Sequence, residues 1–285
     1  MKLSVFTVAT PELMPEELAA AAREAGLDGI EWRYKEIPAD ALQEAPSFWR
    51  HNLCSIDPAT DEAGLARFRH AAEAHGLRSI SVTPYLACGD IAGTERVMQA
   101  ARALGASFIR VGVPWYDGSR SYGDLYKEAV AYLGEVQELA RQYGVRGLVE
   151  THHQTITPSA GLAHRLVAAF DPALIGVLHD AGNMVHEGFE HYRMGLELLG
   201  PHLAHVHVKN AAWVQDGVRA DGSPQWRAVW TPIREGVVDW PQLLGVLRDI
   251  GYDGYLGVED FSGRLPAREM LRQYADSMRE WLALA

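Results

Sequence analysis

One junction recurs along the chain of 285 residues: a helix-like segment, then a glycine, then a short β-rich run. It reads A-R-E-A-G-L-D-G-I-E-W around Gly26 and A-R-Q-Y-G-V-R-G-L-V-E around Gly144. The other copies lie at Gly76, Gly105, Gly200 and Gly251, and a seventh has Asp171-Pro172 as its breaker. Glycine favours the left-handed conformation that ends many helices, so each junction predicts a helix that leads into a strand.

The seven junctions and the opening run predict eight strands. They are expected at 3–8, 29–34, 79–85, 107–113, 147–151, 175–179, 203–209 and 255–259. Strands that alternate with helices pair in parallel, and eight such units can close into a barrel. An open doubly wound sheet is the alternative, but no G-x-G-x-x-G follows the first strand. We therefore expect a single (β/α)8 TIM barrel domain over residues 1–285.

Composition restricts the partners. The formal net charge of -11 argues against nucleic acid or an acidic membrane surface. Cys54 and Cys88 are too few for a disulfide framework. No signal peptide and no apolar run of about 20 residues is recognisable. These features predict a cytoplasmic protein that acts on a small molecule.

Four consecutive predicted strands each end in one side chain that can bind a metal. They are Glu150, Asp180, His207 and Glu259. In a TIM barrel the active site lies at the carboxyl ends of the strands, about 4.8 Å apart, so these groups can converge. Three carboxylates at one point would repel one another without a cation. The pattern therefore favours one divalent ion over a purely structural cluster.

The donor set indicates which ion to expect. Oxygen ligands with one imidazole favour Mn²⁺ or Mg²⁺, with Co²⁺ and Zn²⁺ as alternatives. A closed structural zinc site would use cysteine, and neither cysteine is near these strand ends. We therefore expect an ion with open positions for water or substrate.

The stretch L-A-H-V-H-V-K-N spans residues 203–210. Alternate residues of a strand share a face. The predicted outward row is Ala204, Val206 and Val208, and the predicted inward row is Leu203, His205, His207 and Lys209. His207 lies near the mouth, and His205 is expected to make hydrogen bonds one layer deeper.

Further candidates lie at the rim of the predicted barrel, where each is equally explained by packing. Glu31, with Trp32, follows strand two, Tyr85 follows strand three, and Trp115 follows strand four. We expect Glu31, Tyr85 and Trp115 to contact a polar substrate.

The connection 211–239 is unusually long for a loop in a compact domain, which favours a functional role. It carries Trp213, Trp226 and Trp230, which a packed surface flap would also explain. Its arginines, Arg219, Arg227 and Arg234, either hold a substrate anion or form surface ion pairs.

At these residues the whole chain resembles the xylose isomerase-like TIM barrels, a superfamily of sugar isomerases and epimerases that includes apurinic/apyrimidinic endonucleases. The sharpest pieces are L-V-E-T-H, H-D-A-G-N-M, H-V-H-V-K-N and G-Y-D-G-Y-L-G-V-E. The resemblance assigns metal binding to Glu150, Asp180, His207 and Glu259. It implies that the two glutamates, Glu150 and Glu259, also act as catalytic acid and base. It further implies that His152 and Lys209 contact substrate and that homo-oligomers are common.

Two positions depart from the family pattern. Asn183 stands where the endonucleases and many epimerases have histidine, and Lys209-Asn210 replaces Lys-Asp. The first departure, with the acidic charge, argues against DNA repair.

The resemblance implies a metal-dependent isomerase or epimerase of a sugar or polyol. It would abstract a proton next to a carbonyl through a metal-stabilised enediolate. Loss of a β-hydroxyl from the same intermediate would make the protein a dehydratase of a cyclic polyol or keto acid. A catalytically silent, sugar-binding barrel is the third hypothesis, because fold does not dictate function.

Overall fold

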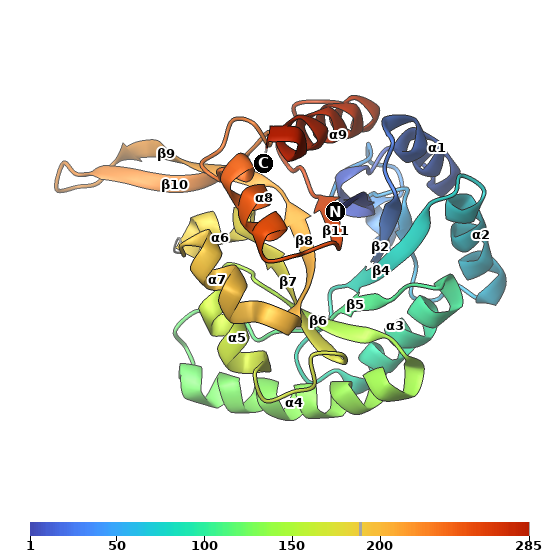
Figure 1. The fold of residues 1–285 in the computed structure, drawn as a ribbon, viewed down its shortest axis with the longest axis horizontal. Coiled ribbons are helices and arrows are strands. Elements are labelled where there is room, and N and C mark those ends of the chain that lie inside the picture. The colour runs from blue at the N-terminus through green and yellow to red at the C-terminus, as the bar shows by residue number, and fades with distance from the viewer. Residues whose placement is uncertain (188–189, 285) are drawn as a thin grey trace.

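Eight parallel strands close into a barrel that is ringed by helices (Figure 1). This computed structural model describes residues 1–187 and 190–284. The barrel order is β1-β11-β8-β7-β6-β5-β4-β2, and β2 pairs with β1 to close it. The strands are β1 (Lys2–Phe6), β2 (Gly29–Tyr34), β4 (Arg78–Pro84), β5 (Phe108–Arg110), β6 (Arg146–Glu150), β7 (Ile175–Asp180), β8 (Leu203–Val208) and β11 (Tyr255–Val258). The predicted TIM barrel is confirmed.

Helices cover the outside of the barrel (Figure 1). They are α1 (Pro15–Ala25), α2 (Glu62–Glu73), α3 (Ile91–Leu104), α4 (Tyr122–Tyr143), α5 (Ala160–Val167), α6 (Ala181–Glu187), α7 (Tyr192–Leu199), α8 (Trp240–Asp249) and α9 (Ala267–Leu284). The glycine junctions work as expected: Gly26 and Gly144 end α1 and α4 with φ of 77° and 67°. A residue with a side chain would be strained at that φ, so these two glycines determine where α1 and α4 end and allow β2 and β6 to begin.

Apolar side chains fill two zones. The large core lies between strands and helices and includes Val206 and Val208. A small separate cluster contains Leu148, Leu178 and Ala204, with Phe108 against it. These residues lie below the polar strand ends, so the barrel interior is apolar at its amino end and charged at its carboxyl end.

The predicted orientation of Leu203 and Ala204 is wrong. Leu203 packs against the outer core, whereas Ala204 joins the small cluster. The cause is a register shift: Val177 pairs with Leu203, but Leu178 pairs with His205. A bulge inserts one residue and reverses the alternation before it. From His205 onward the predicted faces agree with the packing.

The connection predicted as a loop is largely a β-hairpin. β9 (Asn210–Val218) and β10 (Pro224–Thr231) pair antiparallel and project away from the barrel (Figure 1). Asn210 anchors its base, because its Nδ2 donates to the Ile233 carbonyl at 2.8 Å and its Oδ1 accepts from Ala211 and Val238. The hairpin was missed because it is largely exposed and its apolar residues do not alternate regularly with polar ones. A two-residue strand, β3 (Ser55–Ile56), lies beside β2.

Two expectations from composition bear on the described residues. No helix there is both long and apolar enough to cross a membrane. Cys54 and Cys88 are both free thiols.

Candidate metal centre and substrate cavity

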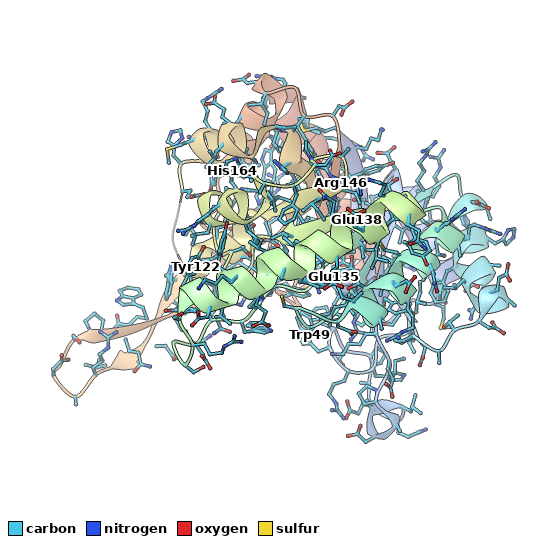
Figure 2. The ribbon with its side chains drawn as sticks, turned by 90° about the horizontal axis from the view of Figure 1, so that it is seen from below. Trp49, Tyr122, Glu135, Glu138, Arg146 and His164 are labelled. Carbon is cyan, nitrogen blue, oxygen red and sulfur yellow. The ribbon has the colours of Figure 1, made fainter. Side chains whose placement is uncertain are left out.

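A cavity of about 410 Å³ opens over the carboxyl ends of the barrel strands. Its floor includes Glu150, Lys209 and Glu259, and aromatic rings from several loops form its walls. In Figure 2, Trp49 of this cavity lies on the side of the barrel where the hairpin leaves, and Arg146 at the start of β6 lies on the opposite side. A larger hollow of about 750 Å³ lies on that opposite side, at the amino ends of the barrel strands. The cavity over the charged strand ends is the candidate site, because the convergent polar groups are there.

The structure brings together the four side chains expected to bind metal. Glu150, Asp180, His207 and Glu259 are all buried, and each offers one ligand atom within 4.8 Å of the others. His207 Nδ1 lies 3.7 Å from Glu150 Oε1, 3.7 Å from Asp180 Oδ2 and 3.6 Å from Glu259 Oε2. Ligand atoms about 2.1 Å from one shared ion lie roughly 3 to 4 Å from each other. These separations therefore suit a single divalent ion.

His207 Nδ1 is buried and has no hydrogen-bond partner among the described residues. Such an atom is costly unless something binds it. The opposite ring nitrogen, Nε2, lies 3.0 Å from Glu31 Oε2 and donates there. Nδ1 therefore points at the three carboxylate oxygens, and once it has lost its proton its lone pair could bind a metal ion there.

Two of the carboxylates are fixed through their second oxygen. Glu150 Oε2 accepts from Arg110 Nη1 at 2.7 Å, and Asp180 Oδ1 accepts from the backbone N–H of Asn183 at 2.8 Å. The Asn183 side chain donates to Glu150 Oε1 at 3.1 Å. These bonds set the direction of the oxygens that face His207.

Glu31 does not line the cavity, although we expected it to contact substrate. Its side chain is fully buried below His207, and its Oε2 also accepts from His205 Nε2 at 2.9 Å. Thr83 donates to its other oxygen. Glu31, His205 and His207 are close enough to hold a metal themselves, but both nitrogens lie at ordinary hydrogen-bond distances from one oxygen. Trp32 is also away from the rim, packed against Phe68.

The two glutamates have opposite electrostatic environments. Burial raises the pKa of Glu150, but Arg110, together with His207, His152 and Lys209, outweighs burial and holds that pKa well below its usual value. Burial also raises the pKa of Glu259, and here the Lys209 ammonium does not overcome it, so that pKa stays raised. Lys209 itself lines the cavity floor. The two carboxylates are therefore chemically different before any ligand binds.

Histidines build one wall of the cavity. His152, a predicted substrate contact, stacks on His153 with ring centroids 4.4 Å apart. His153 stacks on His186 at 4.2 Å, and the Trp230 ring covers His186 at 4.6 Å. Strand alternation would turn His153 away from His152, whereas the two rings stack. β6 ends at Glu150, so strand alternation no longer applies to residues 152 and 153.

The other predicted wall residues lie at the cavity. Tyr85 and Trp115 line it with exposures of 40% and 64%, and the Trp115 ring meets His152 edge-on at 5.5 Å. The arginines of 211–239 turn away from it: Arg227 pairs with Asp216 and Arg234 with Glu280, and Arg219 contacts Ser223.

Sequence reasoning missed Arg110, Trp230 and Phe261 as parts of the site. Arg110 is the last residue of β5, so its place at a strand end was an available signal. Trp230 and Phe261 lie in connections after the seventh and eighth barrel strands. Their positions depend on the path of the hairpin and of the last loop, which no periodicity encodes.

Curated relatives match part of this chain. Inosose dehydratase of Bacillus licheniformis is 28% identical over 160 residues, which cover 52% of both chains. Inosose isomerase of Halalkalibacterium halodurans is 24% identical over 196 residues, 65% of this chain and 64% of the relative. The chain spans about half the length of the dehydratases it matches.

Solved structures share the fold over the whole chain. The IOLI protein, described with a binding zinc atom, superposes with a TM-score of 0.74 at 18% identity, over 100% of this chain and 99% of that one. The model of the xylose isomerase-like TIM barrel family matches residues 19–283, which is nearly the entire chain. With the closed barrel described above, this match means that the protein belongs to the xylose isomerase-like TIM barrel family.

Proposed function

We propose that the protein is a divalent-metal-dependent isomerase or epimerase that moves a proton on the carbon next to a carbonyl of a sugar or polyol. One observation carries the proposal: His207 Nδ1, which has no hydrogen-bond partner among the described residues, faces three carboxylate oxygens, and two of these belong to the cavity-lining Glu150 and Glu259. A cavity of about 410 Å³ falls in the range of small-molecule sites, roughly 300 to 1,000 Å³. The substrate is therefore a small molecule.

Glu150, Asp180, His207 and Glu259 would hold the ion. A bound dication would polarise the substrate carbonyl and stabilise the charge that develops when the neighbouring carbon loses its proton. The oxygen-rich ligand set favours Mn²⁺ or Mg²⁺, and the zinc of the IOLI structure keeps Zn²⁺ as an alternative beside Co²⁺.

Proton transfer falls to the two glutamates. β7 and β8 separate β6, which carries Glu150, from β11, which precedes Glu259. The two carboxylates thus flank Asp180 and His207 and reach the cavity from two sides. One removes the proton and the other, or the same one, returns it. Return to the opposite face gives epimerisation, and return to the neighbouring carbon gives isomerisation.

The cavity walls suit a hydroxylated substrate. Tyr85, Trp115 and Trp230 present flat apolar faces, which cover the C–H faces of a sugar ring. His152 and Lys209 supply polar groups that orient its oxygens. This combination of an apolar wall and a few polar groups is typical of small-molecule sites.

A dehydratase is the second candidate, and the inosose dehydratase relatives favour it. The same proton removal would then be followed by loss of a hydroxyl from the next carbon. The third hypothesis, a silent sugar-binding barrel, predicts no proton removal at all.

Solvent exchange separates these candidates. The Mn²⁺-loaded protein is incubated with a panel of ketoses and inososes in deuterated water, and deuterium at the α-carbon is measured by NMR. Exchange without a new chromophore supports an isomerase or epimerase, whereas an enone or α-keto absorbance supports a dehydratase. No exchange with any member of the panel would contradict both enzymes.

Glu150→Gln tests the proton-transfer role. We expect exchange to fall at least about 1,000-fold, because an amide cannot accept the proton. Glu135→Gln on the outer face of α4 (Figure 2) is the matched control and should exchange like the wild type. Full exchange in Glu150→Gln would exclude the assigned role. Metal analysis of the wild-type protein should also find about one divalent ion per chain.

A further inference from the structure

Lys209 contacts carboxylates of the site in a different way from Arg110, the other positively charged residue there. Its ammonium lies 2.9 Å from Asp180 Oδ2 and also contacts Glu259 Oε2. The side chain is almost fully buried, and its stem runs against Gly182, where a Cβ would come within 2.3 Å of Lys209 Cγ. The backbone of α6 therefore leaves room for this path only because residue 182 is glycine.

The oxygens that Lys209 contacts are two of the three that face His207 Nδ1. Asp180 Oδ2 and Glu259 Oε2 point at both the ammonium and the imidazole. Arg110 differs, because it binds Glu150 through Oε2, whereas Oε1 is the oxygen that faces His207. Arg110 and a metal ion can therefore bind Glu150 together, but Lys209 and a metal ion would share the same oxygens.

We propose that the Lys209 ammonium and the metal ion compete for Asp180 Oδ2 and Glu259 Oε2, so that metal binding displaces Lys209 toward the substrate cavity. The inference rests on the proposed metal site. In the metal-free protein, Lys209 neutralises two carboxylates that would otherwise repel each other in a buried place. The incoming ion takes over that neutralisation and frees the ammonium.

The surroundings of Lys209 provide a place for the displaced ammonium. The rings of Trp230 and Phe261 lie 4.9 Å and 5.2 Å from its nitrogen, and both rings line the cavity. Aromatic faces attract a cation electrostatically and do not hold it in one fixed position. A short rotation of the flexible stem keeps the ammonium in contact with these rings and turns it toward substrate.

The first test measures the affinity of Mn²⁺ alone by calorimetry, for the wild type and for Lys209→Met. Methionine keeps most of the stem and removes the charge. We expect the variant to bind Mn²⁺ at least about tenfold more tightly, because a close positive charge no longer opposes the ion. Its metal-free form should melt at a lower temperature than the wild type, and Mn²⁺ should raise its melting temperature by more.

Lys35→Met is the matched control. Lys35 lines the same cavity, but its ammonium lies over the ring of Tyr85 at 4.8 Å. The same change of charge there should leave Mn²⁺ affinity within about threefold, because solvent screens a more distant charge. Equal gains in both variants would reduce the effect to general electrostatics and overturn the competition.

The second test follows the lysine itself in the wild type. The chain has only four lysines: Lys2, Lys35, Lys127 and Lys209. In a carbon-labelled sample, Mg²⁺ should shift the Cε–Hε NMR signal of Lys209, identified by its loss in Lys209→Met, more than the other three. If Mg²⁺ binds and this signal stays in place, the competition is wrong.

The outcomes separate the two proposals. Wild-type binding of Mn²⁺ with equal or weaker binding by Lys209→Met overturns the competition and leaves the metal-dependent function standing. Failure of both proteins to bind Mn²⁺ overturns the proposed function and the competition together.

Discussion

Two groups of histidines lie within the same site and have opposite environments. His207 is surrounded by carboxylates: burial lowers its pKa, but Glu31, Glu259, Asp180 and Glu150 together outweigh burial and raise it well above the usual value. His153 is in the stacked wall, where burial and the neighbouring His152 lower its pKa to about 4. In the first place a metal ion would have to displace the proton of Nδ1 before it could bind, whereas in the second the histidine is a neutral aromatic surface.

The difference teaches that the neighbours, rather than the motif, decide what a histidine does. T-H-H and H-V-H look alike as candidate metal motifs, yet the rings of His152 and His153 stack face to face at an angle of 19°. Stacked rings do not point their nitrogens at a common centre. His207, by contrast, has one nitrogen fixed by Glu31 and the other directed at three oxygens.

The largest expected effect comes from removing His207, the proposed ligand histidine. His207→Gln should weaken Mn²⁺ binding by at least about 100-fold, because loss of a ligand costs more than loss of its hydrogen-bonded support, for which 10- to 100-fold is typical. Calorimetric titration measures it. His186→Gln makes the same change in the stacked wall and should alter affinity by less than about threefold. Similar losses in the two variants would remove the distinction between ligand and wall.

The support of the ligand histidine gives a smaller effect. Glu31→Gln keeps an oxygen for the His207 Nε2–H group but removes the negative charge that would make Nδ1 a stronger electron-pair donor to a metal ion. We expect Mn²⁺ affinity to fall about 10- to 100-fold. Thr83→Val, which removes the hydroxyl bonded to the other oxygen of Glu31, is the control and should cost less. Wild-type affinity in Glu31→Gln would show that this carboxylate does not tune the ligand.

The barrel could be predicted from the sequence because its signals are local. Each strand after the first follows a glycine or an Asp-Pro within a few residues, and Asp180 and His207 follow apolar runs at the ends of β7 and β8. The convergence of the four polar strand ends then follows from the closed topology.

Other parts of the site depend on contacts between distant residues. Arg110 is part of the site because it binds Glu150, forty positions later. Glu31 is part of it because it binds His207, which is separated from it by 176 positions. The bulge at Leu203 and Ala204 arises from pairing with β7. Such pairings leave no periodic trace, so one sequence cannot reveal them.

The smallest expected effect concerns acid stability of the stacked wall. Because the pKa of His153 is about 4 in the folded protein and about 6.5 in an unfolded chain, the unfolded state binds the proton first. Stability from this group is therefore complete above pH 6.5, falls as the pH drops from 6.5 toward 4, and changes no further below 4. His153→Phe keeps an aromatic ring in the stack and cannot take up the proton.

Urea unfolding of the metal-free wild type and of His153→Phe, each at pH 7.0 and pH 4.5, measures this contribution. The wild type should lose about 1 kcal/mol more between the two pH values than the variant does, a value reduced from the full shift because the ring is only half-buried. His70→Phe, on the exposed face of α2, controls for the loss of a histidine. Parallel pH profiles for the wild type and His153→Phe would mean that His153 binds a proton as readily in the folded wall as in the unfolded chain. The contrast between the histidines of the stacked wall and His207 among its carboxylates would then rest on geometry alone.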